Sequence, residues 1–596
     1  MLMKYLGLFR KGVLFSLVVL MTTALFRCAN VMAPTGGPKD VTPPEIVKAV
    51  PPNHSPNFTG NKFSLTFDEF VQLKEINKQL LISPPMVHLP DFRIRKKTLI
   101  VRFNEPLKPN TTYSVFFGDA IQDVNEGNPL HNFTYVFSTG KEIDSLSMRG
   151  KVVNARDLKP EKGVYVMLYK NDNDTVPFDS LPLRVKPYYL SKTDKNGKFF
   201  FSGLADTSYL IFALKDENYS LTYDQPGEEI AFLDSLVTPQ YRPKPEIDTV
   251  LLDSLTKGLP SDSAGLIADS LWKAADSIAD SKLTLYQLYL FREAPKVQRV
   301  EAISLVRPNT IRFVFHIPAR NITVRSLRYH PESVWYQSEW NKSRDTLYWF
   351  LRLPHPDTLD LLVMNGKDTL EDKHLRVIPH QRLPGKKRKK QEKKKVIYLS
   401  WKANHTGNIK PGERLVFTFD QPVKKIIDDS VLLIQDRDSV WHPAYSFLDD
   451  LHRKVYFPLK IKDGSTCKLI IPDSAVIDWN GFYNKRIVLT LQAKPLKDYG
   501  EINMTVHPKQ TGHYIFNLLS AKGDPVAVSY FASPTTLHFT RMNPGKYRFR
   551  IIFDSNGNKK WDPGNYLEKR LPEKVIYYGK TIQLRANWDV NESWEF

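Results

Sequence analysis

Short runs in which apolar and polar residues alternate occur along most of the chain. Phe63, Leu65 and Phe67 alternate with polar neighbours, and the run Thr310–Phe315 has the same pattern. A period of two is typical of a β-strand with one buried face. Turn signals such as Asn196 followed by glycine separate these runs, because both residues adopt positive φ readily. The pattern therefore predicts many short strands, and we expect an all-β protein.

Parts of this pattern occur twice in the chain. Residues 201–224 return at 539–562 without a gap, so that Asp216 falls on Asp554. Residues 63–71 likewise match residues 415–423. Repetition on this scale predicts an array of modules, and such arrays usually display or bind rather than catalyse.

Length, repeats and turn signals divide the 596 residues into five β-modules with connecting segments. We expect the modules at residues 42–140, 145–245, 285–380, 396–495 and 500–596. An insertion rich in Asp and Ser fills residues 246–284, and a basic linker fills residues 381–395. The stretch from Asp269 to Asp280 has the spacing of a short amphipathic helix that could bind a partner, and a solvated, disordered insertion is the alternative.

Two kinds of module resemble known families. The first module contains, in order, Leu65-Thr-Phe-Asp68, Pro109-Asn-Thr-Thr-Tyr113, Ile121-Gln-Asp-Val-Asn-Glu-Gly-Asn128 and Phe137-Ser-Thr-Gly140. It resembles a bacterial Ig-like domain of the surface-layer-protein (SbsA) type, the fourth module is a second copy, and the third is a divergent one. The second and fifth modules are similar to transthyretin-like or carboxypeptidase-regulatory-like β-sandwiches. These resemblances imply tandem β-sandwiches with a spacer or display role and no activity.

The N-terminus has the pattern of an export signal. Lys4, Arg10 and Lys11 precede an apolar stretch over residues 13–26. This stretch is shorter than the roughly 20 apolar residues of a membrane-spanning helix. The following residues, through Cys28, resemble a bacterial lipoprotein signal. That resemblance implies a signal peptide at residues 1–28 with lipid on Cys28. The Pro and Gly content of the residues that follow predicts a tether at residues 29–41.

Arg27 stands where the lipoprotein pattern has a small residue, so an uncleaved anchor and ordinary cleavage are alternatives to lipidation. We expect a lipid-anchored protein of the cell envelope at the outer membrane, on either its periplasmic or its surface face. Only Cys28 and Cys467 are present, so the chain has no disulfide framework. Cys467 lies in a strand-like run and is interpreted as a strand residue rather than a reactive thiol.

Charge adds one candidate binding segment. The formal net charge is +20, and the basic run at residues 386–395 supplies part of it. A solvated linker is one interpretation, and binding to anionic lipid head groups or envelope polysaccharide is the other. The run contains no aromatic residues for base stacking, and the export signal argues against nucleic acid as a partner.

The repeated loops are candidate Ca²⁺ sites. Asp554, Asn556, Asn558 and Asp562 place oxygen side chains at positions 1, 3, 5 and 9 of a tight loop, which suits a hard cation. Asp216, Asn218, Ser220 and Asp224 are their counterparts. Both loops lack the glycine and glutamate of an EF-hand, and Asx-turns that satisfy their own backbone are the alternative. No other cofactor is expected.

No catalytic motif is present: the sequence has no Gly-x-Ser-x-Gly, His-Glu-x-x-His, phosphate-binding glycine loop or Cys-x-x-Cys. We therefore expect a non-enzymatic envelope lipoprotein, a β-sandwich rod that supports, displays, or binds an envelope protein or glycan. The alternative is a carbohydrate-binding or other accessory subunit of an envelope enzyme or transport system. An open row of indole rings would favour that alternative, and the candidate rings are Trp335, Trp340, Trp349, Trp561 and Trp588.

Overall fold

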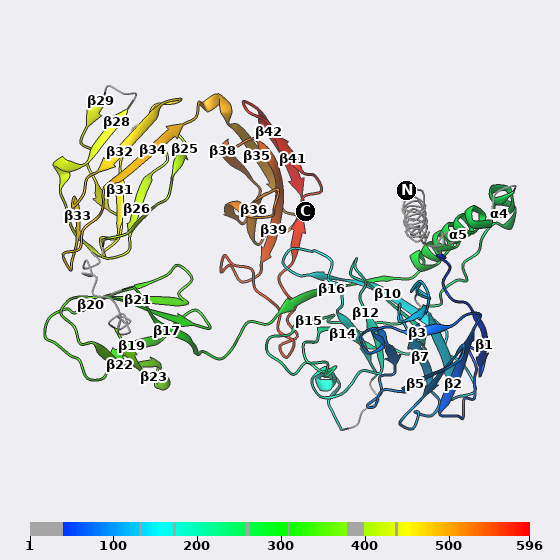
Figure 1. Ribbon diagram of the computed structural model, residues 1–596. Helices are drawn as coiled ribbons and strands as arrows, with labels where there is room; N and C mark the ends of the chain where they lie inside the picture. Colours follow the sequence, from blue (N-terminus) through cyan, green and yellow to red (C-terminus); the bar gives the residue numbers. More distant parts are fainter. Residues whose placement is uncertain are drawn as a thin grey trace, which may run out of the picture.

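The computed structural model describes residues 40–596, except 132, 171–174, 258–260, 308, 378–397, 436–438 and 460. Strands form most of its regular structure and belong to five successive β-sandwich modules (Figure 1). The expectation of an all-β, multidomain fold is confirmed. The signal peptide with Cys28, nearly all of the tether and the basic linker lie outside the described residues. Among the residues described, no helix combines the length and apolarity needed to cross a membrane.

The first module is a sandwich of two antiparallel sheets with strand orders β1-β2-β6-β5 and β4-β7-β9, and β3 pairs with β8 at its side. Alternation in β2 places Phe63, Leu65 and Phe67 in the core, each at most 2% exposed. The elements are β1 (Ile46–Val50), β2 (Lys62–Phe67), β3 (Val71–Leu73), α2 (Ile76–Gln79), β4 (Leu81–Ser83), β5 (Asp91–Arg95), β6 (Thr98–Arg102), β7 (Thr112–Phe116), β8 (Ile121–Asp123) and β9 (Thr134–Ser138).

The third module repeats both sheets of the first, with strand orders β17-β18-β21-β20 and β19-β22-β23. It has no counterpart of the β3–β8 pair among the described residues, which fits a divergent copy. Its strands are β17 (Val300–Arg307), β18 (Thr310–Phe315), β19 (Ile322–Ser326), β20 (Tyr336–Trp340), β21 (Thr346–Leu351), β22 (Thr358–Asn365) and β23 (Asp368–Arg376).

The fourth module repeats the first more fully. Its sheets have the orders β24-β26-β31-β30 and β25-β34-β32-β28-β29, and β27 pairs with β33 as β3 pairs with β8. Cys467 is buried within β32, as expected for a strand residue. The elements are β24 (Trp401–Ala403), β25 (Gly407–Ile409), β26 (Leu415–Phe419), β27 (Val423–Ile426), η2 (Asp428–Ser430), β28 (Leu432–Gln435), β29 (Ser439–Trp441), β30 (Ser446–Phe447), β31 (Lys454–Phe457), β32 (Thr466–Ile471), β33 (Val476–Asp478), β34 (Ile487–Ala493) and the following η3 (Leu496–Asp498).

The second module differs from the expected boundary at residue 245, because its sheet is completed by a strand beyond the insertion. The strand order is β12-β11-β14-β15-β16-β10-β13, and β16 runs parallel to β10. The elements are β10 (Leu146–Asn154), β11 (Tyr165–Tyr169), η1 (Phe178–Ser180), α3 (Leu181–Arg184), β12 (Tyr189–Lys192), β13 (Lys198–Leu204), β14 (Leu210–Lys215), β15 (Glu229–Phe232) and β16 (Leu285–Arg292). The segment 285–292 therefore belongs to the second module and not to the third.

The fifth module repeats most pairings of the second, but the described residues show no counterpart of the β15–β16 pair, so its strands form two sheets, β38-β35-β42 and β37-β36-β39-β40 with β41 beside β39. In β35-β38 and β36-β37 the strands are antiparallel, and the final strand β42 runs parallel to β35 as β16 does to β10. The internal repeat is thus present in topology as well as in sequence. The strands are β35 (Gly500–His507), β36 (His513–Ser520), β37 (Pro525–Phe531), β38 (Thr535–Met542), β39 (Gly545–Asp554), β40 (Val575–Tyr577), β41 (Ile582–Leu584) and β42 (Asp589–Glu595).

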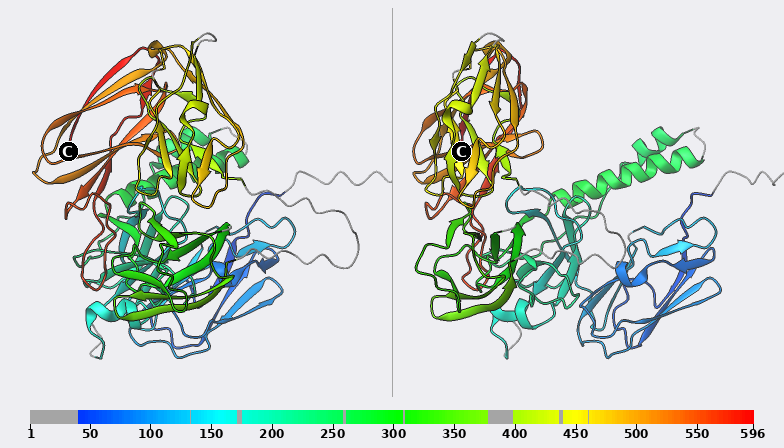
Figure 2. Two further views of the ribbon diagram at one scale, coloured as in Figure 1. Left: turned by 90° about the vertical axis from the view of Figure 1, so that its left-hand side faces the viewer. Right: turned by 60° about the vertical axis from the view of Figure 1, so that its left-hand side comes forward.

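The insertion in the second module is a helical hairpin of α4 (Thr249–Thr256) and α5 (Ser261–Ser281) that projects from the body (Figure 2). The helix is longer than the stretch expected from the sequence. Arg242 anchors its base, with Nη2 2.9 Å from Asp276 and Nε 2.7 Å from Asp280. Trp272 and Ile278 are exposed on α5.

The modules do not form the extended rod expected from the sequence. The third and fourth contact each other, where buried Gln421 donates to Thr310 over 2.6 Å, and Arg541 of the fifth donates to the Pro411 carbonyl of the fourth. Loops of the fifth module then return to the second (Figures 1 and 2). Modules two to five therefore close into a ring.

Candidate functional site at the junction of the second and fifth modules

The long loop between β39 and β40 carries a tyrosine into the core of the second module. Tyr566 is 1% exposed, and its ring lies edge-on to Phe212 and Phe232, with centroids 5.0 and 5.1 Å away. Aromatic pairs prefer this edge-to-face arrangement. The contact joins residues more than 300 positions apart in the chain.

A tight turn presents this ring. Asn565 and Arg570 exchange backbone hydrogen bonds of 2.7 and 3.0 Å, and Lys569 takes a positive φ of 52° within the turn. The Tyr566 N–H donates to the Glu293 carboxylate of the second module over 2.6 Å. The turn and this hydrogen bond fix the direction in which the tyrosine enters.

A second contact lies on the outer face of the β36–β39 pair. Arg550 is largely buried, and its Nε donates to Asn517 Oδ1 over 3.0 Å. Its Nη1 donates to the Arg156 carbonyl of the second module over 3.3 Å. A buried guanidinium needs such partners, because its desolvation is costly.

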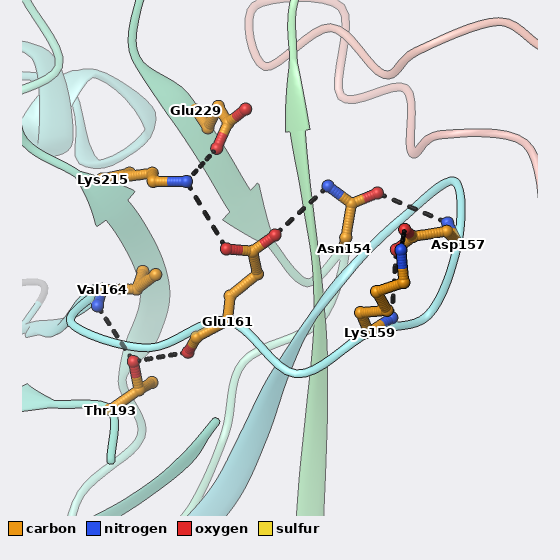
Figure 3. Close-up of polar contacts among 8 residues, drawn as sticks. All are labelled: Asn154, Asp157, Lys159, Glu161, Val164, Thr193, Lys215 and Glu229. Atoms are coloured by element: carbon orange, nitrogen blue, oxygen red, sulfur yellow. Dashed lines mark hydrogen bonds and ion pairs between the residues drawn. The ribbon is translucent and has the colours of Figure 1, made fainter. Parts of the chain in front are cut away.

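A polar network holds the loop that presents the Arg156 carbonyl (Figure 3). Glu161 accepts from Asn154 at 3.3 Å and contacts Lys215 at 3.4 Å, and Lys215 also contacts Glu229 at 2.9 Å. The hydrogen bond with Glu229 is the main cause that raises the pKa of Lys215, and Glu161 adds to it. The backbone of Glu161 accepts from Thr193 over 2.7 Å. The network keeps the loop in one shape, so the junction rests on a preformed surface.

The candidate Ca²⁺ loop of the fifth module satisfies its own polar groups. Asp554 accepts backbone N–H groups of Asn558 and Lys559 at 3.0 and 2.8 Å. Asp562 Oδ2 accepts from the amide nitrogens of both Asn556 and Asn558, at 2.5 and 2.7 Å. A cation here requires both amides to turn their oxygens inward. Ca²⁺ binding by this loop stays a prediction.

The corresponding loop of the second module has the same form. Asp216 accepts from the N–H groups of Asn218 and Leu221 at 3.2 and 2.9 Å, and Asn218 donates to Asp224 over 3.0 Å. The Ser220 hydroxyl donates to a backbone carbonyl. Across the described chain, no group of three His, Cys, Asp or Glu side chains is arranged to hold a metal. Both loops show the Asx-turn geometry that was the alternative.

The five tryptophans do not form an open row. Trp349 is 2% exposed, and its ring stacks on that of Tyr336 with the centroids 3.9 Å apart. The Trp335 ring lies edge-on to Trp349, with the centroids 5.8 Å apart. Trp340 and Trp561 are half-buried, and Trp561 donates its indole N–H to the Glu573 carbonyl. Only Trp588 is largely exposed, at 52%. Packed rings of this kind are core residues rather than a sugar-binding platform.

Raised carboxylate pKa values are a feature of many catalytic sites, and two of the carboxylates that have them, Asp420 and Asp478, lie in the fourth module. Burial raises the pKa of Asp420 although Arg307 is beside it, and burial raises the pKa of Asp478 to about 6. Asp420 accepts a hydrogen bond from the N–H of Ser400. Neither Asp420 nor Asp478 lines the two cavities found among the described residues. We interpret both as structural carboxylates of the fourth module.

Comparison with known proteins supports the prediction that the first module is Ig-like. A family model described as bacterial Ig-like domain matches residues 40–139. It does not distinguish the SbsA type and covers one module of five. No curated protein matches the chain.

Several solved structures are similar, all at low identity. The Bacillus anthracis TIE protein is 9% identical, with 94% of this chain and 76% of that chain covered and a TM-score of 0.13. The S-layer protein rSbsC is 12% identical, with 91% and 67% covered and a TM-score of 0.14. The Bacillus cereus major pilin subunit BcpA is 10% identical, with 75% and 98% covered and a TM-score of 0.12. These scores are too low to transfer a function or a domain arrangement.

Proposed function

We propose that the protein is a non-catalytic scaffold of the cell envelope, attached by lipid on Cys28 at the outer membrane. Its five β-sandwiches form a braced frame that holds a binding surface for an envelope protein or glycan. The Ig-like match of residues 40–139 and the repeated sandwich topology support this structural role. The lipoprotein-like signal around Cys28 supports the location.

The insertion of Tyr566 into the second module is the observation that carries the proposal. A chain of modules joined only by short linkers bends at each linker, because small interdomain contacts permit relative motion. A return contact from the last module to the second removes that freedom. The result is a frame of fixed dimensions, which suits a scaffold better than a flexible tether.

The proposal is tested in cells through the lipid. Mass spectrometry of the N-terminal peptide should find Cys28 acylated, and fractionation should place the protein with the outer membrane. A Cys28→Ala variant should leave the membrane fraction, whereas a Cys467→Ala variant should remain in it. An unmodified, soluble wild-type chain would contradict the proposal, and so would a hydrolytic activity that co-purifies with it.

A further inference from the structure

A cavity of about 730 Å³ lies between the third module and the β39–β40 loop of the fifth. Five cationic side chains line it: Lys296, Arg320, Lys342, Arg344 and Lys560. The first four come from three segments of the third module, with Lys342 and Arg344 in the same β20–β21 turn, and Lys560 comes from the fifth. Among the described residues that line the cavity there is no Asp, Glu or aromatic residue. The fold therefore gathers positive charge from two modules in one hollow.

Nearby acidic residues are engaged elsewhere and do not neutralise this charge. Glu301 contacts Arg299 and His316, at 2.9 and 2.6 Å. Asp345, next to Arg344, accepts hydrogen bonds from Asn341 and Thr346. Within the described part of the chain, none of the five cations has a carboxylate within ion-pair distance. Mutual repulsion among them is relieved only by solvent or by a bound anion.

One cation is held in a fixed position. Arg344 has a φ of 58°, its Nε donates to the Ala319 carbonyl over 3.0 Å, and its guanidinium lies 5.4 Å from the Trp340 ring centroid. These contacts use one edge and one face of the guanidinium. Its Nη groups form the fork that binds two oxygens of a phosphate.

The wall of the cavity is also preformed. Gln298 is clamped to the backbone of Ile317, donating to its carbonyl at 2.7 Å and accepting from its N–H at 3.1 Å. On the opposite module, the N–H of Lys560 donates to Asn558 Oδ1 over 2.8 Å. A ligand that touches both sides connects the third module to the fifth.

We propose that this cavity binds a multivalent phosphate ligand, such as the phosphate groups of a phosphorylated glycan or of a lipid head group. The volume lies within the usual range for small-molecule sites, roughly 300–1,000 Å³. The absence of aromatic rings from the described lining argues against recognition by stacking on a base or a neutral sugar. The cavity provides positive charge and the paired hydrogen-bond donors of a guanidinium, and phosphate oxygens interact favourably with both.

Titration calorimetry with sodium tripolyphosphate tests this proposal on the full chain carrying Cys28→Ala. We expect saturable binding that weakens as salt is added, because exposed charges are screened. The double variant Arg320→Gln/Lys342→Gln should bind about tenfold more weakly, since each exposed charge pair contributes up to about 1 kcal/mol. Lys560→Gln alone should weaken binding about threefold by the same relation.

The matched control is Lys367→Gln/Arg376→Gln, which removes the same charge from exposed positions of the third module outside the cavity. This control variant should bind tripolyphosphate with an affinity within about twofold of that of the wild type. An equal loss of affinity in both double variants would show that binding responds only to net charge, and it would overturn the proposal. A wild-type chain that shows no saturable binding would overturn it as well. Unchanged circular dichroism and melting confirm that the variants fold.

Competition against bound tripolyphosphate separates the two sources of phosphate. Displacement by yeast phosphomannan supports a glycan, and displacement by phosphatidylglycerol vesicles supports a lipid head group. If neither displaces it and neutral mannan binds instead, the proposed phosphate chemistry is wrong.

Discussion

The ring of Tyr566 in the fifth module lies edge-on to that of Phe212 in the second, with the two centroids 5.0 Å apart. This contact turns a linear array of modules into a closed ring, and it defines which changes should open that ring.

Replacing Tyr566 with alanine should open the junction. Truncation of a fully buried aromatic side chain typically costs about 3–5 kcal/mol. We expect small-angle X-ray scattering to show a larger radius of gyration for Tyr566→Ala than for wild type. Tyr219→Ala, at a tyrosine that is 76% exposed in the second module, should leave the scattering unchanged.

Tyr566→Phe should keep the ring closed. The Tyr566 hydroxyl is buried without a hydrogen-bond partner among the described residues, and an unsatisfied buried polar group is destabilising. Removing it should leave the free energy of closure unchanged or improve it by about 1 kcal/mol. Scattering curves of this variant that match those of Tyr566→Ala would show that the hydroxyl, not the ring, holds the junction.

Gly564→Ala should weaken the same junction by a clash. A Cβ atom at position 564 would lie 2.5 Å from the Phe291 ring and 2.6 Å from the Arg570 carbonyl oxygen, closer than packed atoms approach. The control is Gly579→Ala in the same module, where no atom lies within 4 Å of the added carbon. Proteolysis of the 555–574 loop should become faster only in the first variant.

Asp123 and Asp478 hold equivalent positions in the first and fourth modules, paired with Val71 and Val423. Burial raises the pKa of Asp123, but N–H groups from Gly127 and its neighbours reach both its oxygens and bring the pKa below the usual value. Asp478 accepts two N–H groups on Oδ1 only. Its Oδ2 has no partner among the described residues, and its pKa is about 6.

The fourth module should therefore lose stability as pH rises from about 4 to above 6. In that window the folded state binds a proton that the unfolded state has lost, so ionisation penalises folding. The penalty is at most about 3 kcal/mol, from about two pKa units at 1.36 kcal/mol each. As pH rises through this window, hydrogen exchange of the β33 amides in the wild-type full chain, corrected for intrinsic rates, should become faster. A similar pH dependence in Asp478→Asn would contradict this assignment.

A fragment of residues 145–293 should fold, whereas one that ends at residue 245 should not. The shorter fragment lacks β16, which supplies Leu288 and Leu290 to the core, both at most 1% exposed. Circular dichroism and thermal melting would compare the two. Cooperative melting of the shorter fragment would show that β16 is dispensable.

This boundary also shows what the sequence could and could not predict. Strands such as β2 and β26 were predictable because their alternating residues match their buried faces. The partner of β10 was not, since the insertion separates β16 from its module and local patterns do not encode pairing across such a gap.

The junction itself left only an indirect trace in the sequence. Between β39 and β40 lie residues 555–574, whereas the matching interval between β14 and β15 is residues 216–228. The added length in the fifth module includes Tyr566 and its turn. The longer loop shows only that residues have been added at this place. Which module the loop contacts depends on how whole modules are placed in space, so the sequence pattern predicted an open rod.

Carbodiimide cross-linking tests the closed ring most directly. Lys569 Nζ lies 3.3 Å from a carboxylate oxygen of Asp179, and this pair joins the fifth module to the second. Zero-length coupling followed by mass spectrometry should recover that peptide pair in the wild type and lose it in Tyr566→Ala. The pair Lys215–Glu229, within one module, should appear in both. Recovery of Lys215–Glu229 without Lys569–Asp179 in the wild type would contradict the closed arrangement.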